Sequence, residues 1–206
     1  MTLKVVTGGS VSAAVADFVP QLVADKVASR IAAKDFTLWG KDAEAESSIR
    51  LGWVTSAHDS APLVDGILAL RDEFAAKGVN RFVLCGMGGS SLAPEVLAKS
   101  YKREIFIVDS TDPNYISHAL NGDLAKTVFV VSSKSGSTIE TSSQRALFQA
   151  KVVEAGLNPV EHIIFVTDPG SPLDIETRAA GFTVVNADPN VGGRFSALSA
   201  FGVVPA

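Results

Sequence analysis

From residue 81 onward, short apolar stretches alternate with stretches of helical periodicity. The apolar stretches carry Val, Ile and Phe at consecutive positions, so strands formed by them would be buried on both faces. They are RFVLC (81–85), EIFIVD (104–109), TVFVVS (127–132), HIIFVT (162–167) and FTVVN (182–186). The helical stretches between them cover 91–99, 113–120, 138–155 and 172–179. This alternation predicts a doubly wound α/β domain with a five-stranded parallel sheet.

The first 80 residues show helical periodicity without such strands. Apolar residues recur at helical spacing from Val11 to Ile31, and Pro20 should kink or split the helix that they form. A second helix is expected from about Pro62 to Lys77. Its buried face should hold Leu63, Ile67, Leu70 and Phe74. We therefore expect residues 1–80 to form an N-terminal helical segment that packs on an α/β domain formed by residues 81–206.

Composition and charge narrow the classes of function. A net charge of −4 argues against a general binder of nucleic acid or of an anionic membrane. No apolar stretch approaches the roughly 18 residues needed to span a bilayer, and the start lacks the long apolar core of a signal peptide. Cys85 is the only cysteine, which excludes an internal disulfide and a multi-cysteine zinc site. We expect a cytoplasmic protein without a metal, in which Cys85 is a small buried hydrophobe.

The turn after the first strand is a candidate site, because ligands of doubly wound sheets bind at the carboxyl ends of the strands. In CGMGGSSLAPEVL (85–97), glycines allow a tight turn and a close backbone approach. Ser90 or Ser91 can cap the following helix, whose free amides favour an anion. The stretch also matches the first two glycines of the dinucleotide fingerprint, but Ser91 replaces the third. A structural turn, an anion site and a dinucleotide site stay open here.

The turn after the third strand carries the richest chemistry. In SSKSGSTIET (132–141), Gly136 permits the turn, and Ser137 with Glu140 fits a capping box. The box gives no structural role to Ser133, Lys134, Ser135 and Thr138. Hydroxyls, free amides and the positive end of a helix dipole converge here, which suits a phosphate monoester. Because the Walker A pattern is absent, a phosphorylated metabolite is favoured over a nucleoside triphosphate.

Three further turns follow the remaining strands. Asp112 before Pro113 and Ser171 before Pro172 read as helix caps followed by proline, and capping explains them fully. The last turn, DPNVGGRFSALSAFG (188–202), places Gly192 and Gly193 directly before Arg194. The paired glycines should bring the backbone close to a neighbour, and the arginine could aim its guanidinium at an oxyanion.

Three segments, CGMGGSSLAPE, SSKSGSTIET and DPNVGGRFSALSAFG, resemble the glucose-6-phosphate isomerase family. The first two would mark only the broader sugar-isomerase (SIS) fold, which also includes aminosugar-phosphate enzymes and sugar-sensing regulators. The third is much more specific to the isomerase. The stretch containing TLWG resembles the bacterial branch that includes transaldolase-fused forms.

The resemblance implies reversible interconversion of glucose 6-phosphate and fructose 6-phosphate in glycolysis and gluconeogenesis, through an enediolate and without metal or cofactor. It assigns substrate contact to Gly89 and Ser90, and stabilisation of the enediolate to Arg194. It assigns phosphate binding to Ser133, Lys134, Ser135, Gly136, Ser137 and Thr138. It also makes a homodimer an expected assembly, since family members commonly dimerise.

The chain departs from the family pattern in two respects. The commoner loop reads S-K-T-F-T-T, whereas Ser135 replaces the threonine here and Gly136 the phenylalanine, which keeps the hydroxyl pattern. Family members continue through a second domain that carries the glutamate base, a histidine for ring opening and a lysine. We therefore expect a truncated isomerase that is inactive alone. The alternatives are a sugar-phosphate sensor on the same fold and, on the weak glycine pattern, a nucleotide-dependent oxidoreductase.

Overall fold

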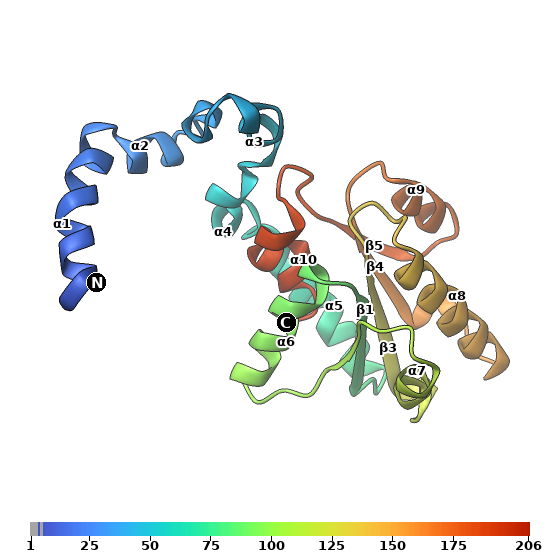
Figure 1. Cartoon of the computed structure of the whole chain (residues 1–206). Helices are drawn as coiled ribbons and strands as arrows, with labels where there is room; N and C mark the ends of the chain where they lie inside the picture. The colour runs from blue at the N-terminus through green and yellow to red at the C-terminus, as the bar shows by residue number, and fades with distance from the viewer. Residues whose placement is uncertain (1–3, 5) are drawn as a thin grey trace.

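The computed structural model describes residue 4 and residues 6–206. All strand pairs of its central sheet are parallel, in the order β2-β1-β3-β4-β5 (Figure 1). The strands are β1 (Arg81–Gly86), β2 (Phe106–Val108), β3 (Thr127–Ser132), β4 (Ile163–Thr167) and β5 (Thr183–Asn186). Each predicted apolar stretch forms one strand, so the predicted fold class is confirmed.

Helices cover both faces of the sheet (Figure 1). One face packs against α7 (Pro113–Leu120), α8 (Ile139–Glu154) and α9 (Pro172–Ala179). The other packs against α5 (Leu63–Ala76) and α10 (Ala200–Val203), with α6 (Gly89–Ser100) beside α10. The predicted caps are confirmed, since Asp112 accepts a hydrogen bond from the amide of Tyr115 and Ser171 from that of Asp174.

Three residues of the first core face show how closely the sheet packs against its covering helices. Phe129 of β3 and Phe148 of α8 have no exposed surface, and their ring centroids lie 4.6 Å apart. Cys85 of β1 is equally buried, and this burial raises the pKa of its thiol. The thiol therefore stays protonated and packs as a small hydrophobe.

The N-terminal part begins with α1 (Gly9–Ala24) and α2 (Val27–Ala32). Of the two predicted effects of Pro20, a kink or a split, the split does not occur, because α1 continues through this proline. The two helices are separated instead at Asp25 and Lys26, where Lys26 adopts a left-handed backbone with φ of 53° that interrupts the helix. Short elements follow: η1 (Phe36–Trp39), η2 (Lys41–Ala43), α3 (Glu44–Arg50), η3 (Gly52–Val54) and α4 (Ser56–Asp59).

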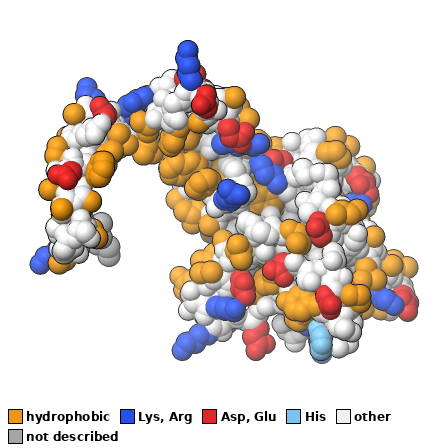
Figure 2. Space-filling model, viewed as in Figure 1, with side chains coloured by type: hydrophobic (Ala, Val, Ile, Leu, Met, Phe, Trp, Pro, Cys, Tyr) orange, Lys and Arg blue, Asp and Glu red, His pale blue; other side chains and the backbone are white. Residues whose placement is uncertain are grey.

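The two halves of the N-terminal part relate differently to the core. Neither α1 nor α2 contains a buried residue, and Figure 1 shows α1 extending away from the sheet. Figure 2 shows hydrophobic side chains at the surface of this segment. From Leu51 onward the chain does contact the core, since Leu51 is buried and bridges to Val191. On α5, Phe74 is buried and the other predicted core residues are half-buried, which confirms its predicted face.

No helix in the described part of the chain combines the length and the apolar character needed to cross a membrane.

Candidate phosphate-binding site

A cavity of about 170 Å³ lies at the carboxyl ends of β1 and β3. Its walls come from the turns after these two strands, from the first turn of α8 and from the start of η6 (Gly193–Leu198). This is the edge where a parallel sheet is expected to bind ligands. The lining residues are Met87, Gly89, Ser90, Ser132, Ser133, Lys134, Ser135, Thr138, Thr141 and Gly193.

The turn after β3 holds its shape through hydrogen bonds among its own small residues. The Gly136 amide donates to Ser133 Oγ at 3.2 Å, and the Ser137 amide donates to Ser135 Oγ at 3.2 Å. Gly136 has φ of +73°, and a Cβ there would lie 2.5 Å from Leu173 Cβ. Both the backbone conformation and the packing therefore require glycine at this position.

The predicted capping box of Ser137 and Glu140 is wrong. The N-cap of α8 is Thr138, and no side chain caps the helix, because the Ser137 hydroxyl pairs with the Ser135 hydroxyl at 2.7 Å instead. As a result, the amides of residues 139–141 have no hydrogen-bond partner in the described part of the chain. These amides point out of the positive end of the α8 dipole, and that arrangement attracts an anion.

The turn after β1 forms the opposite wall. The N-cap of α6 is Gly88, with φ of 56°, and it has no side-chain cap. The prediction that Ser90 or Ser91 caps this helix is therefore wrong. Both serines lie inside the first helical turn, where Ser91 Oγ donates back to the Gly88 carbonyl at 3.1 Å. Ser90 instead contributes to the cavity lining.

The glycines of the last turn approach the turn after β1. A Cβ on Gly89 would lie 2.0 Å from the Gly193 carbonyl oxygen, so the two backbones touch only because Gly89 has no side chain. Ser196 strengthens this contact, since its hydroxyl lies between the two carbonyl oxygens, 2.7 Å from that of Gly193 and 3.2 Å from that of Gly89. A Cβ on Gly193 would meet nothing within 4 Å. The close approach predicted for Gly192 and Gly193 thus exists, but Gly89 is the residue that makes it possible.

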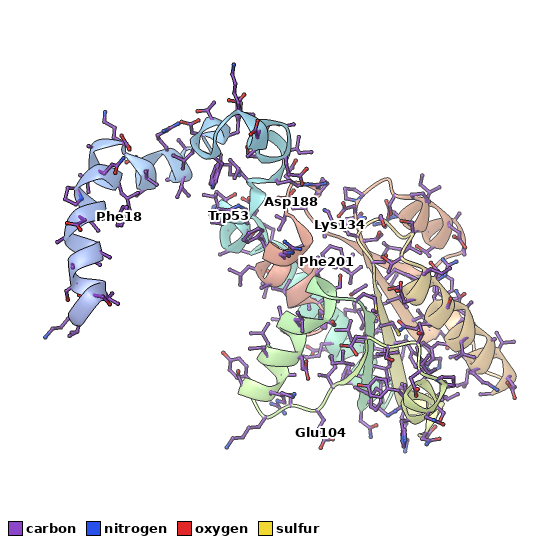
Figure 3. All side chains as sticks on the ribbon, in the orientation of Figure 1. Phe18, Trp53, Glu104, Lys134, Asp188 and Phe201 are labelled. Carbon is purple, nitrogen blue, oxygen red and sulfur yellow. The ribbon has the colours of Figure 1, made fainter. Side chains whose placement is uncertain are left out.

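The lysine of the loop is already paired with an acidic residue. Lys134 Nζ lies 2.7 Å from Asp168 Oδ2, and it also donates to the Pro189 carbonyl at 3.2 Å. Figure 3 shows Lys134 close to the loop that carries Asp188. The side chain therefore joins the turns after β3, β4 and β5, and much of its charge is neutralised within the protein. Hydroxyls and amides are the donors that remain for an anion.

Arg194 follows Gly193 directly and lies outside the cavity lining. Its side chain is exposed and makes no hydrogen bond or ion pair with another described residue. The next residue, Phe195, stacks on Trp53 with ring centroids 5.6 Å apart. The N-terminal segment thereby supports the loop that carries the arginine.

Sequence reasoning found one part of this site and missed another. The predicted residues that line the cavity are Gly89, Ser90, Ser133, Lys134, Ser135 and Thr138, whereas Gly136, Ser137 and Arg194 lie beside it. The lining residues that were missed are Met87, Ser132, Thr141 and Gly193. Thr141 follows Thr138 at helical i, i+3 spacing, so a helical-face argument could have found it.

Comparison with known proteins places the chain in a family. The phosphoglucose isomerase family matches residues 71–206. The glucose-6-phosphate isomerase of Campylobacter jejuni is 38% identical over 162 residues, covering 69% of this chain and 38% of the relative. That of Chlamydia muridarum is 34% identical over 156 residues, covering 72% of this chain and 28% of the relative.

Solved structures agree with this assignment. A hypothetical protein from Thermus thermophilus superposes with a TM-score of 0.73 at 30% identity, covering 94% of this chain and 45% of that one. A glucose-6-phosphate isomerase from Chlamydia trachomatis superposes with a TM-score of 0.62 at 29% identity, covering 84% of this chain and 33% of that one. The chain thus spans less than half the length of each of these relatives. With most of its residues matched by the family, this chain belongs to the phosphoglucose isomerase family.

Proposed function

We propose that this chain is the phosphosugar-binding part of a glucose-6-phosphate isomerase, which interconverts glucose 6-phosphate and fructose 6-phosphate through an enediolate. The observation that carries the proposal is the cavity at the start of α8, which is lined by loop hydroxyls and lies at the helix end where the amides of residues 139–141 have no partner among the described residues. A phosphate monoester presents several acceptor oxygens to such donors. This anchoring would leave the sugar free to extend toward the turn after β1 and the loop that carries Arg194.

The roles of the loop residues follow from their positions. Ser133, Ser135 and Thr138 donate their hydroxyls to the phosphate, and the amides of residues 139–141 add further donors. Gly136 and Ser137 shape the loop rather than touch the ligand. Lys134 holds the loop through its ion pair with Asp168, and its positive charge balances the negative charge of this carboxylate beside the cavity. Gly89 and Ser90 contact the substrate from the opposite wall.

Arg194 has the chemistry needed for the reacting end of the sugar. Its guanidinium has no partner among the described residues and can turn toward a ligand that is anchored at the phosphate loop. A fixed positive charge near the developing enediolate lowers the barrier to proton transfer. We propose this role for Arg194 in the complete enzyme.

The reaction also needs a general base, which we propose is supplied outside this chain. Among the described residues, the cavity lining contains no carboxylate and no imidazole. The chain covers 38% and 28% of the two curated relatives, so most of each relative has no counterpart here. We therefore propose that this chain binds the sugar phosphate but does not turn it over alone.

The experiment is a calorimetric titration of the purified chain with fructose 6-phosphate, 6-phosphogluconate and NAD. We expect both phosphorylated ligands to bind and NAD not to bind. Ser133→Ala should weaken fructose 6-phosphate binding about tenfold or more, because a hydrogen bond to a charged group is lost. The control is Ser143→Ala, since this exposed serine of α8 bonds only to its own helix, at the Ile139 carbonyl.

Two results would contradict the proposal. Binding of NAD without binding of either sugar phosphate would favour the oxidoreductase alternative. Substantial isomerase turnover by this chain alone, measured by coupled production of glucose 6-phosphate, would show that a base within the chain has been overlooked.

We also propose a cytoplasmic location and a homodimeric assembly. A phosphorylated sugar is charged and stays in the compartment where it is made, which supports the location.

The exposed apolar side chains of α1, including Val15, Phe18 and Leu22, offer a surface for association. Light scattering should give the mass of a dimer, reduced by Phe18→Ser but not by Val153→Ser, an exposed apolar position on α8. A monomeric wild-type chain at all concentrations would rule out this assembly.

A further inference from the structure

Two buried hydroxyls in the wall of the cavity lack hydrogen-bond partners. Ser132 is the last residue of β3 and is 1% exposed, while Thr141 lies in the first turn of α8 and is 2% exposed. Both residues line the cavity. Neither Ser132 Oγ nor Thr141 Oγ1 has a partner in the part of the chain that the structure describes.

Their neighbours at the same edge of the sheet are satisfied. Ser133 Oγ accepts from the Gly136 amide, and Thr167 Oγ1 donates to the Lys134 carbonyl at 3.2 Å. A buried hydroxyl without a partner destabilises the folded protein, because it has lost its bonds to water. Alanine in place of Ser132 or valine in place of Thr141 would fill nearly the same space without this cost. The two hydroxyls therefore call for an explanation other than folding.

The two residues border the cavity from different elements. Ser132 pairs in register with Gly86 of β1. A Cβ on Gly86 would lie 3.1 Å from Ser90 Cβ and 3.4 Å from Ser132 Cβ, so Ser132 and Ser90 approach this point of β1 closely only because Gly86 has no side chain. Thr141 lies three residues after Thr138, the N-cap of α8, and both residues line the cavity. Ser132 thus reaches the cavity wall from the end of β3, and Thr141 reaches it from the first turn of α8.

We propose that Ser132 and Thr141 are additional phosphoryl-binding residues, which donate hydrogen bonds to the phosphate end of the ligand after a rotation about χ1. This inference rests on the proposed function and adds donors that the loop sequence does not reveal. The Ser135 hydroxyl is already paired with the Ser137 hydroxyl, whereas the Ser132 and Thr141 hydroxyls have no bond to give up in the described part of the chain. A hydrogen bond from Ser132 or Thr141 to the phosphate therefore breaks no existing hydrogen bond of the protein.

The test combines stability without ligand and affinity for two ligands. The variants are Ser132→Ala and Thr141→Val, each measured by thermal unfolding and by titration with inorganic phosphate and with fructose 6-phosphate. We expect an unchanged or raised unfolding midpoint, together with about tenfold weaker binding of both ligands. Thr141→Ser keeps a hydroxyl and should bind more tightly than Thr141→Val.

A matched control separates a ligand-binding hydroxyl from a structural one. Thr177 is a threonine of α9 that is 2% exposed, and its Oγ1 donates to the Leu173 carbonyl at 2.6 Å. Thr177→Val should lower the unfolding midpoint and leave both affinities unchanged. The contrast with Thr141→Val is therefore expected in both measurements.

The possible failures can be told apart. Wild-type affinity in both variants would overturn this inference and leave the proposed function intact, as expected if a permanently bound water satisfies the hydroxyls. Weaker binding of fructose 6-phosphate alone would place the contact on the sugar and overturn the phosphoryl assignment. A lowered midpoint in both variants at wild-type affinity would make the hydroxyls structural. A wild-type chain that binds no sugar phosphate would overturn the proposed function and this inference together.

Discussion

Replacing Gly89 by alanine should separate the two loops that enclose the cavity. The new Cβ would lie 2.0 Å from the Gly193 carbonyl oxygen and 2.6 Å from its carbonyl carbon. Ordinary contact begins at 3.4 Å, so the backbone around Gly193 would have to move by about 1.4 Å. A backbone cannot rotate away as a flexible side chain can. The bond from Ser196 Oγ to the Gly89 carbonyl would be disturbed as well.

The magnitude follows from the cost of overpacking. Adding a methyl group to a well-packed region destabilises a protein by about 1–3 kcal/mol, and contact with rigid backbone favours the upper end. For a chain of this size, each kcal/mol lost from the free energy of unfolding lowers the unfolding midpoint by about 2–4 °C. At about 2–3 kcal/mol, we therefore expect Gly89→Ala to lower the midpoint by about 4–12 °C. We also expect weaker binding of fructose 6-phosphate, because the cavity walls move apart.

The opposite side of the same contact provides the control. A Cβ on Gly193 would meet nothing within 4 Å, and Gly193 does not have a positive φ. Gly193→Ala should therefore change the free energy of unfolding by about 0.5 kcal/mol or less. Thermal and urea unfolding, followed by circular dichroism, measure both variants. Equal stability losses, or a larger loss for Gly193→Ala, would refute the steric argument.

Three further changes test the support around the site. Gly136→Ala should lower the free energy of unfolding in urea by about 2–4 kcal/mol, because it combines left-handed backbone strain with overpacking against a buried leucine of α9. Gly170→Ala is the control, since Gly170 also has a positive φ but a Cβ there would meet open space. A loss for Gly170→Ala as large as that for Gly136→Ala would contradict this reasoning. Several hydrogen bonds lower the pKa of Asp174, and the bond from the Gly170 amide has the largest effect. The carboxylate therefore stabilises the fold above about pH 4, and this contribution is lost as the pH falls through the native pKa. Asp174→Asn should therefore be less stable than wild type at pH 7, and a difference in unfolding free energy that persists undiminished at pH 2 would argue against this account. Phe148→Ala removes the ring that stacks on Phe129 and should lower the free energy of unfolding by about 3–5 kcal/mol in the same assay. A loss below about 1 kcal/mol would mean that this contact does not hold α8 against the sheet.

The local features of the fold were predictable because they depend on neighbouring residues only. Short runs of consecutive apolar residues are typical of strands in a parallel sheet that is covered on both faces, and each predicted stretch became a strand. The caps at Asp112 and Ser171 were predictable for the same reason, since a side chain there reaches an amide three residues away. The position of the hydroxyl-rich loop at the end of β3 follows from this strand order along the chain.

The details of the site were not predictable from local pattern. Ser137 and Glu140 match a capping box, yet the positive φ of Gly136 turns Ser137 toward Ser135 and makes Thr138 the N-cap. The packing of the loop against α9 sets the loop geometry, and this geometry overrides the capping that the spacing of Ser137 and Glu140 would otherwise favour. Local spacing therefore identified the hydroxyls of the loop but not which of them face the cavity.

The sequence by itself determined the class of fold, the strands and the position of the hydroxyl-rich loop, because these arise from interactions between near neighbours. Tertiary structure alone decided the contact between Gly89 and Gly193, the placement of Ser132 and Thr141 in one cavity wall, and the exposure of the apolar residues of α1. These features depend on which distant segments meet across the sheet edge. Periodicity along a chain predicts that a face is apolar, but only the folded arrangement decides what covers it.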